Sequence, residues 1–122
     1  MVRDIVMVAV GGAAGSVLRY LVSGWIAALA GRAFPWGTLV VNVIGCLAIG
    51  LLAGSIPAER LSPLARLMLV TGFCGGFTTF STFALENMSM LQSGRMLQTA
   101  LYVGGSVVAG IMAAWAGMRI AS

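Results

Sequence analysis

The chain has 122 residues, of which 60% are hydrophobic and 8% are charged. Because a soluble domain carries about a quarter charged residues, this composition excludes a water-soluble fold and predicts an integral membrane protein. The net charge of +4 comes from seven arginines and three carboxylates that are scattered singly along the chain, so the pattern does not indicate a nucleic-acid partner.

Four apolar segments are each long enough to cross a lipid bilayer as a helix, which takes about 20 residues. The segments span residues 5–30, 38–56, 64–91 and 96–119. The first continues too far to be the apolar core of a signal peptide, and Pro57 and Pro63 separate the second from the third. The sequence therefore predicts an all-α integral membrane protein, with residues 1–122 forming a single four-helix transmembrane domain.

The first segment contains the stretch GGAAGSVLRY, in which Gly11 and Gly15 are followed by Arg19 at four-residue spacing. Small residues at this spacing let two membrane helices approach closely. A positive charge midway along a membrane helix is costly, and it usually marks a pathway, a cavity or an ion pair. Arg19 is therefore a candidate functional residue.

Asn42 stands inside the second segment, where its carboxamide needs partners in place of water. It begins a row of small residues that recurs at every fourth position and continues with Cys46, Gly50 and Gly54. Such a row lies on one helix face and favours close packing. Cys46 and Cys74 have neither metal-ligand spacing nor an extracellular loop, so we expect two buried free thiols.

The third segment contains GGFTTFSTF at residues 75–83, which combines a glycine pair with four hydroxyl side chains and three phenylalanines. Gly72, Gly75 and Gly76 make a continuous helix costly, so we expect an interruption near residues 72–76. Non-helical backbone at membrane depth persists only where it is buried in protein or lines a polar cavity. An interruption frees carbonyl oxygens, which need donors or a cation, and leaves amide groups that favour an anion.

Phe80 and Phe83 follow the expected interruption and lie three residues apart, on one helix face. An aromatic ring has a positive edge, and the hydroxyl groups of Thr79, Ser81 and Thr82 are donors on neighbouring faces. Together these groups suit a small anion that accepts strong hydrogen bonds. The residues leave open a second interpretation, an apolar stripe in which the hydroxyl groups bond to their own backbone.

Two further polar features lie beyond this motif. Glu86 follows Phe83 by one helical turn and places a carboxylate in the third segment. In the fourth segment, Tyr102, Ser106 and Gly110 recur at four-residue spacing and share one face.

The arginines are divided almost evenly between the two sides of the expected membrane. One side carries Arg3, Arg60, Arg66 and Arg119, and the other carries Arg32 and Arg95, with Arg19 lying towards it. Orientation normally follows a clear excess of positive charge on one side. The balance is compatible with insertion in both orientations, and equally with a single orientation set by the first helix.

These features together carry a resemblance to a known family. The third-segment motif GGFTTFSTF, the NVIG that begins at Asn42, the GGAAGSVLRY of the first segment and the four-span plan resemble the Fluc-type fluoride channels, also called CrcB. The resemblance covers essentially the whole chain. It implies an antiparallel, dual-topology homodimer in the bacterial inner membrane, with the third helix broken mid-membrane, that lets cytoplasmic fluoride leave passively.

The resemblance also implies roles for individual residues. The backbone carbonyls of Gly75 and Thr78 are expected to bind a structural sodium ion between the two subunits. Asn42, Phe80 and Phe83 are expected to contact fluoride. The rest of the expected anion pathway consists of Thr79, Ser81, Thr82, Glu86, Arg19, Tyr102 and Ser106.

Two other classes of membrane protein share this size and helix count. A proton-coupled four-helix exporter needs a titratable carboxylate in its substrate chamber, and Glu86 is the candidate in the spans. A non-transporting assembly subunit would use its polar residues only to lock helices together. An enzyme is not indicated, because the sequence has no histidine and no pairing of a nucleophile with a base.

Overall fold

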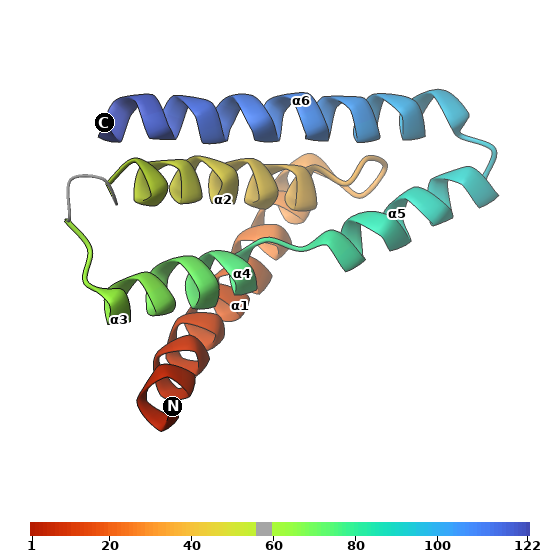
Figure 1. Cartoon of the computed structure of the whole chain (residues 1–122). Coiled ribbons are helices and arrows are strands. Elements are labelled where there is room, and N and C mark those ends of the chain that lie inside the picture. The colour runs from red at the N-terminus through yellow and green to blue at the C-terminus, as the bar shows by residue number, and fades with distance from the viewer. Residues whose placement is uncertain (56–59) are drawn as a thin grey trace.

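The computed structural model describes residues 1–55 and 60–122, and these residues are mostly helical (Figure 1). The elements are α1 (Val2–Ala30), α2 (Trp36–Ser55), α3 (Pro63–Arg66), the π-helix η1 (Leu67–Cys74), α4 (Gly75–Phe77), α5 (Phe80–Gln92) and α6 (Met96–Ala121). Within the described residues, four helical stretches are long and apolar enough to cross a membrane: Val2–Ala30, Trp36–Ser55, Pro63–Gln92 and Met96–Ala121. The all-helical class and the four apolar spans are thus confirmed. The predicted end of the second segment at residue 56, and the role of Pro57, lie outside the described residues.

Local signals set where several helices begin and end. Gly31 and Gly94 have φ angles of 82° and 76°, in the left-handed region that glycine adopts without steric cost, and they follow α1 and α5. At the start of α3, the Ser62 side-chain oxygen accepts a hydrogen bond from the Ala65 N–H at 3.1 Å. Pro63 occupies the first turn of that helix, where its missing N–H costs nothing.

Helices α2 and α6 pack side by side and run in the same direction (Figure 1). Glycines permit their close approach. A Cβ atom on Gly50 would overlap the carbonyl group of Ala114, and one on Gly117 would overlap the carbonyl group of Leu47. The backbones of the two helices are therefore in direct contact over this stretch.

Helix α1 packs mainly against η1 and α4. A Cβ atom on Gly11 would overlap the carbonyl group of Met68, and one on Gly15 would overlap the carbonyl group of Phe73. The packing role predicted for Gly11 and Gly15 is therefore confirmed, and it ties the first helix to the segment that precedes the polar motif.

The prediction of an interruption near residues 72–76 was wrong in its position. Gly75 has helical dihedral angles (φ −62°, ψ −38°), and the extended residues are Thr78 (φ −87°, ψ 158°) and Thr79 (φ −149°, ψ 118°), between α4 and α5. Gly72 and Gly76 have a different purpose, because their missing side chains let this segment lie against the backbone of α1. They are packing glycines inside helical backbone.

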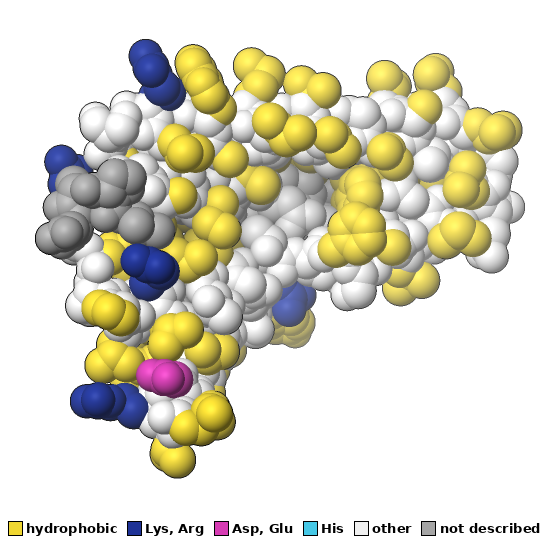
Figure 2. Space-filling model, viewed as in Figure 1, with side chains coloured by type: hydrophobic (Ala, Val, Ile, Leu, Met, Phe, Trp, Pro, Cys, Tyr) yellow, Lys and Arg dark blue, Asp and Glu magenta, His cyan; other side chains and the backbone are white. Residues whose placement is uncertain are grey.

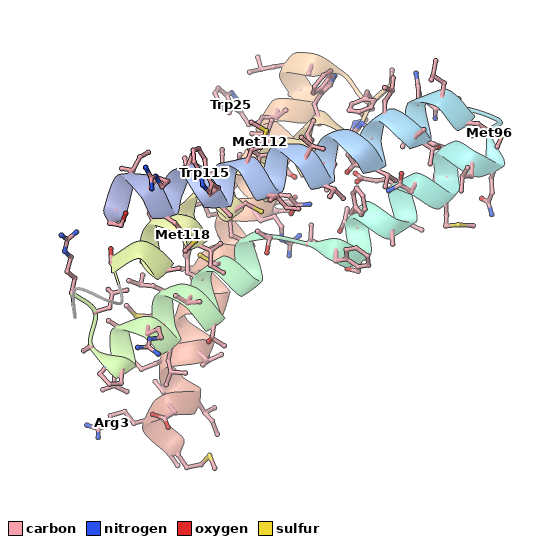
Figure 3. The ribbon with its side chains drawn as sticks, turned by 45° about the horizontal axis from the view of Figure 1, so that its top comes forward. Arg3, Trp25, Met96, Met112, Trp115 and Met118 are labelled. Atoms are coloured by element: carbon pink, nitrogen blue, oxygen red, sulfur yellow. The ribbon has the colours of Figure 1, made fainter. Side chains whose placement is uncertain are left out.

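The buried side chains lie between α2, the third span and α6, and much of the outer surface is apolar. Val41, Phe77 and Tyr102 are almost fully buried, whereas Trp25 and Trp115 are each 64% exposed on the outside (Figure 3). Figure 2 shows hydrophobic side chains spread over the visible face and most of the visible arginines near the end that holds both termini. Such a surface suits hydrocarbon or another apolar protein face.

Candidate functional site

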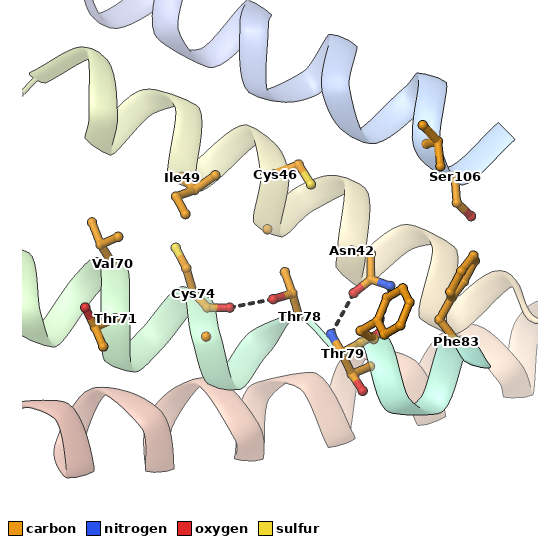
Figure 4. Close-up of a pocket in the computed structure, with 14 residues that line it drawn as sticks. Asn42, Cys46, Ile49, Val70, Thr71, Cys74, Thr78, Thr79, Phe83 and Ser106 are labelled. Atoms are coloured by element: carbon orange, nitrogen blue, oxygen red, sulfur yellow. Dashed lines mark hydrogen bonds between the residues drawn. The ribbon is translucent and has the colours of Figure 1, made fainter. Parts of the chain in front are cut away.

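A pocket of about 520 Å³ lies beside the two extended residues, between α2, the third span and α6 (Figure 4). Its lining is mostly apolar, and it includes Asn42, Cys46, Thr79, Phe80, Phe83 and Ser106. The pocket thus brings together residues from three of the four spans. The pocket is not enclosed, and Phe80 in its lining is 79% exposed.

Asn42 binds the extended backbone with both ends of its carboxamide. Its Oδ1 accepts a hydrogen bond from the Thr79 N–H at 2.8 Å (Figure 4), and its Nδ2 donates to the Thr79 carbonyl oxygen at 3.2 Å. The side chain therefore pairs with Thr79 as a neighbouring strand would. Three residues further along α2, Gly45 leaves room for the methyl group of Thr78, which a Cβ atom at that position would overlap.

The backbone carbonyl groups of residues 75–78 lose their regular helical donors at this point, among them those of Gly75 and Thr78. In a continuous helix, the Thr79 N–H would bind the Gly75 carbonyl, and the Thr82 N–H would bind the Thr78 carbonyl. The Thr79 N–H instead binds Asn42, and the Thr82 N–H binds the Thr79 side-chain oxygen at 3.2 Å. Thr79 thus caps α5, and the carbonyl oxygens of Gly75 and Thr78 are left available to other partners.

Arg19 lies on the α1 side of the same segment. Its Nε donates a hydrogen bond to the carbonyl oxygen of Gly76 at 2.9 Å, in the last turn before the extended residues. A guanidinium group at the carbonyl end of a helical segment is stabilised by the helix dipole as well as by the hydrogen bond. Arg19 is therefore bound to the backbone at the end of α4, and it is outside the residues that line the pocket.

The rings of Phe80 and Phe83 both line the pocket, and their centroids are 5.7 Å apart at an interplanar angle of 41°. Phe83 also contacts the ring of Tyr102, with centroids 4.8 Å apart. The two pocket rings have different surroundings, because Phe83 is half-buried against α6 whereas Phe80 projects from the protein. The predicted shared location of these two rings is thus observed.

Glu86 is held by two hydroxyl groups in a cluster next to the pocket. Tyr102 donates to Oε1 at 2.7 Å and Thr38 donates to Oε2 at 2.8 Å, and both donors are almost fully buried. Sequence reasoning missed Thr38. It lies one helical turn before Asn42, so extending the four-residue row of the second segment backwards would have found it.

The remaining hydroxyl groups differ in their partners. The Ser106 oxygen is buried in the pocket wall and has no hydrogen-bond partner among the described residues. Ser81 is exposed, and its hydroxyl oxygen lies 3.4 Å from the side-chain oxygen of Thr79. The Thr79 hydroxyl donates to the Thr82 hydroxyl at 3.1 Å. Thr78 donates to the carbonyl group of Cys74 at 2.8 Å. Several hydroxyl groups therefore bond locally, as the alternative interpretation of the motif expects, whereas the Ser106 oxygen is buried beside the pocket without a partner among the described residues.

Cys46 and Cys74 are both free thiols; Cys74 is buried as predicted, whereas Cys46 is only partly buried. They come from α2 and from the end of η1, and both line the pocket.

The chain is similar to known proteins over almost its whole length. The family described as "CrcB-like protein, Camphor Resistance (CrcB)" matches residues 6–118. A Rhizobium etli protein named fluoride-specific ion channel FluC is 49% identical over 115 residues, covering 93% of this chain and 92% of its own length. Proteins of the same name from Geobacter sulfurreducens and Flavobacterium psychrophilum are 48% and 45% identical, covering 96% and 98% of this chain and 95% and 97% of their own lengths.

Proposed function

This chain belongs to the CrcB family, and on that premise we propose that it is a fluoride-selective ion channel that lets cytoplasmic fluoride leave the cell passively. It is a multi-pass membrane protein, and in a bacterium its location is the inner membrane. Its relatives are named as ion channels, a function that involves no catalysis. The structural observation that supports the proposal most directly is the convergence of Asn42, Phe80 and Phe83 on one pocket.

The pocket offers the groups that a dehydrated fluoride ion requires. The carboxamide of Asn42 has two N–H groups, of which one binds Thr79, so the second is available to the anion. The Phe80 and Phe83 rings contribute positive edges, and Ser106 contributes a hydroxyl group without a partner among the described residues. A channel must bind its ion strongly enough to replace water but weakly enough to release it, and such neutral donors meet both conditions.

A fluoride-electrode measurement on purified protein in liposomes tests this function. With potassium fluoride inside and a potassium ionophore to balance charge, a channel should release fluoride down its gradient without a proton gradient. A proton-coupled exporter of cationic cargo should release no fluoride, and neither should an assembly subunit; a carrier that exchanged fluoride for protons would take up one proton for each fluoride ion released, which an internal pH dye detects. Glu86 argues against the exporter, because both of its oxygens are bound by hydroxyl donors within the chain.

We propose that the working unit is an antiparallel homodimer. The pocket is not enclosed and Phe80 is 79% exposed, and both observations support a second subunit at this face, because one subunit alone leaves the ring uncovered. The near-even division of arginines supports insertion in both orientations. The third span would then change from helix to extended backbone within the membrane, at Thr78 and Thr79.

Labelling of single cysteines should therefore find both orientations in one membrane. After Cys46 and Cys74 are replaced by alanine, Ser93→Cys and Ser122→Cys provide one reporter near each end of α6. We expect a membrane-impermeant thiol reagent to modify about half of either reporter in intact cells and the rest after permeabilisation. Complete labelling of one reporter and complete protection of the other would refute the antiparallel arrangement.

We also propose that the carbonyl oxygens of Gly75 and Thr78 bind a structural sodium ion in the dimer. Both carbonyl groups have lost their regular helical donors, and hard cations prefer oxygen ligands of this kind. The ion would supply fixed positive charge beside the pocket. The side chains of these two positions are not required as ligands, and the Thr78 hydroxyl is already bound to Cys74.

Sodium retention should therefore depend on the backbone and not on the Thr78 side chain. Thr78→Val should keep bound sodium, measured by elemental analysis after transfer to a sodium-free buffer. Thr79→Pro should lose it, because proline removes the N–H that Asn42 accepts and cannot adopt the observed φ of −149°. Loss of sodium from Thr78→Val alone would assign the ligand to the side chain and contradict the proposal.

A further inference from the structure

A second pocket, of about 560 Å³, lies at the end of the molecule where α2 and α6 finish. Its lining includes Gly54, Arg60, Trp115, Met118, Arg119 and Ser122. None of these residues lines the pocket that holds Asn42 and the phenylalanine rings. The proposed channel function leaves this second pocket unexplained.

Two arginines stand at the second pocket and are held by contacts within the chain. One guanidinium nitrogen of Arg60 donates to the carbonyl oxygen of Ala121 at 3.1 Å. The guanidinium carbon of Arg119 lies 5.9 Å from the ring centroid of Trp115, within the range of a cation–π contact. Among the described residues, neither arginine forms an ion pair with a carboxylate. The contacts within the described residues thus leave N–H donors on both guanidinium groups for an external anion, and guanidinium groups suit phosphate oxygens.

The position of the pocket relative to the membrane indicates which kind of molecule supplies the anionic group. Helix α2 ends at Ser55 and α6 ends at Ala121, so the two arginines lie where the apolar spans stop and the headgroup layer begins. Trp115, one helical turn before Arg119 on α6, is a residue typical of this interface (Figure 3). The deeper lining of Ala53, Gly54 and Met118 is apolar, as a site for the upper part of an acyl chain must be.

From this juxtaposition of two arginines, an interfacial tryptophan and an apolar floor, we propose that the second pocket binds one anionic phospholipid, with the phosphate group at Arg60 and Arg119. The remaining arginines of this side, Arg3 and Arg66, attract anionic lipid only through general surface charge, because they are outside the pocket. The inference requires a membrane setting but not fluoride conduction. A chain without channel activity would bind the lipid equally well.

Native mass spectrometry of the purified protein tests the proposal with phosphatidylglycerol and phosphatidylcholine as probes. We expect the wild-type protein to retain phosphatidylglycerol in preference to phosphatidylcholine. The double variant Arg60→Gln, Arg119→Gln should retain about tenfold less phosphatidylglycerol, since it removes both charge-assisted contacts. The matched double variant Arg3→Gln, Arg66→Gln removes the same charge from the same side and should retain it normally.

A third variant tests the apolar part of the site while keeping both arginines. Met118→Trp should fill the floor and lower phosphatidylglycerol retention, whereas inorganic phosphate should neither bind measurably nor displace the lipid. Gel filtration identifies any variant that fails to fold. If either the Arg60→Gln, Arg119→Gln variant or Met118→Trp fails to fold, the other one decides the result. Equal losses in the two arginine double variants would overturn the proposal in favour of diffuse surface charge. Unchanged retention in the pocket variants, or displacement of the lipid by phosphate, would also overturn it.

Discussion

Fluoride efflux through the Asn42→Asp variant should fall about 100-fold or more in reconstituted liposomes, although the protein folds. An aspartate keeps the acceptor for the Thr79 N–H, but it loses the donor that binds the Thr79 carbonyl and the donor available to the anion. A hydrogen bond to a charged group contributes about 1.5–3 kcal/mol, and each 1.4 kcal/mol at the barrier changes a rate about tenfold. Repulsion between the carboxylate and fluoride slows passage further.

Asn42→Ala serves as the matched variant, because it removes both contacts with Thr79 and introduces no charge. Its thermal unfolding, followed by circular dichroism, should show what the two hydrogen bonds contribute to stability, about 0.6 kcal/mol each if they are average for membrane proteins. Its efflux should exceed that of Asn42→Asp because the repulsive charge is missing. Normal efflux through the aspartate variant would place Asn42 outside the anion pathway.

Replacing either pocket ring should suppress fluoride efflux without preventing folding. Phe80→Ile and Phe83→Ile each keep an apolar side chain but remove the positive ring edge, so we expect at least about a tenfold loss, which corresponds to about 1.4 kcal/mol at the barrier. The measurement is fluoride efflux per folded protein, with gel filtration as the check on assembly. Phe80 is the more informative position, because its 79% exposure within one subunit means that few contacts inside the chain are lost.

Phe73→Ile provides the comparison for the ring substitutions. Phe73 stacks on Phe77 with ring centroids 5.7 Å apart and an interplanar angle of 8°, and neither ring lines the pocket. The same substitution there changes packing on η1 without touching the proposed pathway, so efflux should remain near normal. If both pocket variants also conducted normally, the phenylalanine pair would be a packing feature.

The helices could be predicted from the sequence because long apolar segments have one stable arrangement in a bilayer. The position of the non-helical backbone could not. Gly72 and Gly76 appeared to be helix breakers, but their missing side chains accommodate α1, a role that depends on a contact between distant parts of the chain. Asn42 on α2 supplies the hydrogen bonds of Thr79, and Gly45 leaves space for Thr78, which the motif does not report. Its one local signal is a threonine at position 79, a residue type that caps helices.

At the candidate site, the residues themselves could be predicted from the sequence, but their partners on other helices could not. Asn42, Phe80 and Phe83 could be singled out because polar and aromatic residues at these spacings are unusual for a plain membrane helix. Their partners could not be derived, since pairing Asn42 with Thr79 or Arg19 with Gly76 requires the packing of separate helices. Thr38 could have been noticed from the row that continues through Asn42, but its partner could not, because Glu86 belongs to a different span.

The pairing of α2 with the extended residues has a consequence for how this protein can be recombined with its relatives. Asn42 supplies the hydrogen bonds of Thr79, and Gly45 supplies the space for Thr78, so the backbone shape of residues 78–79 is encoded partly in a different helix. A chimera that takes only the third span from another protein separates residues 78–79 from the α2 residues that determine their backbone shape. A hybrid whose second span comes from a parent with other residues at positions 42 and 45 should therefore lose this backbone shape, which makes Trp36–Ser55 and residues 72–83 one unit of exchange.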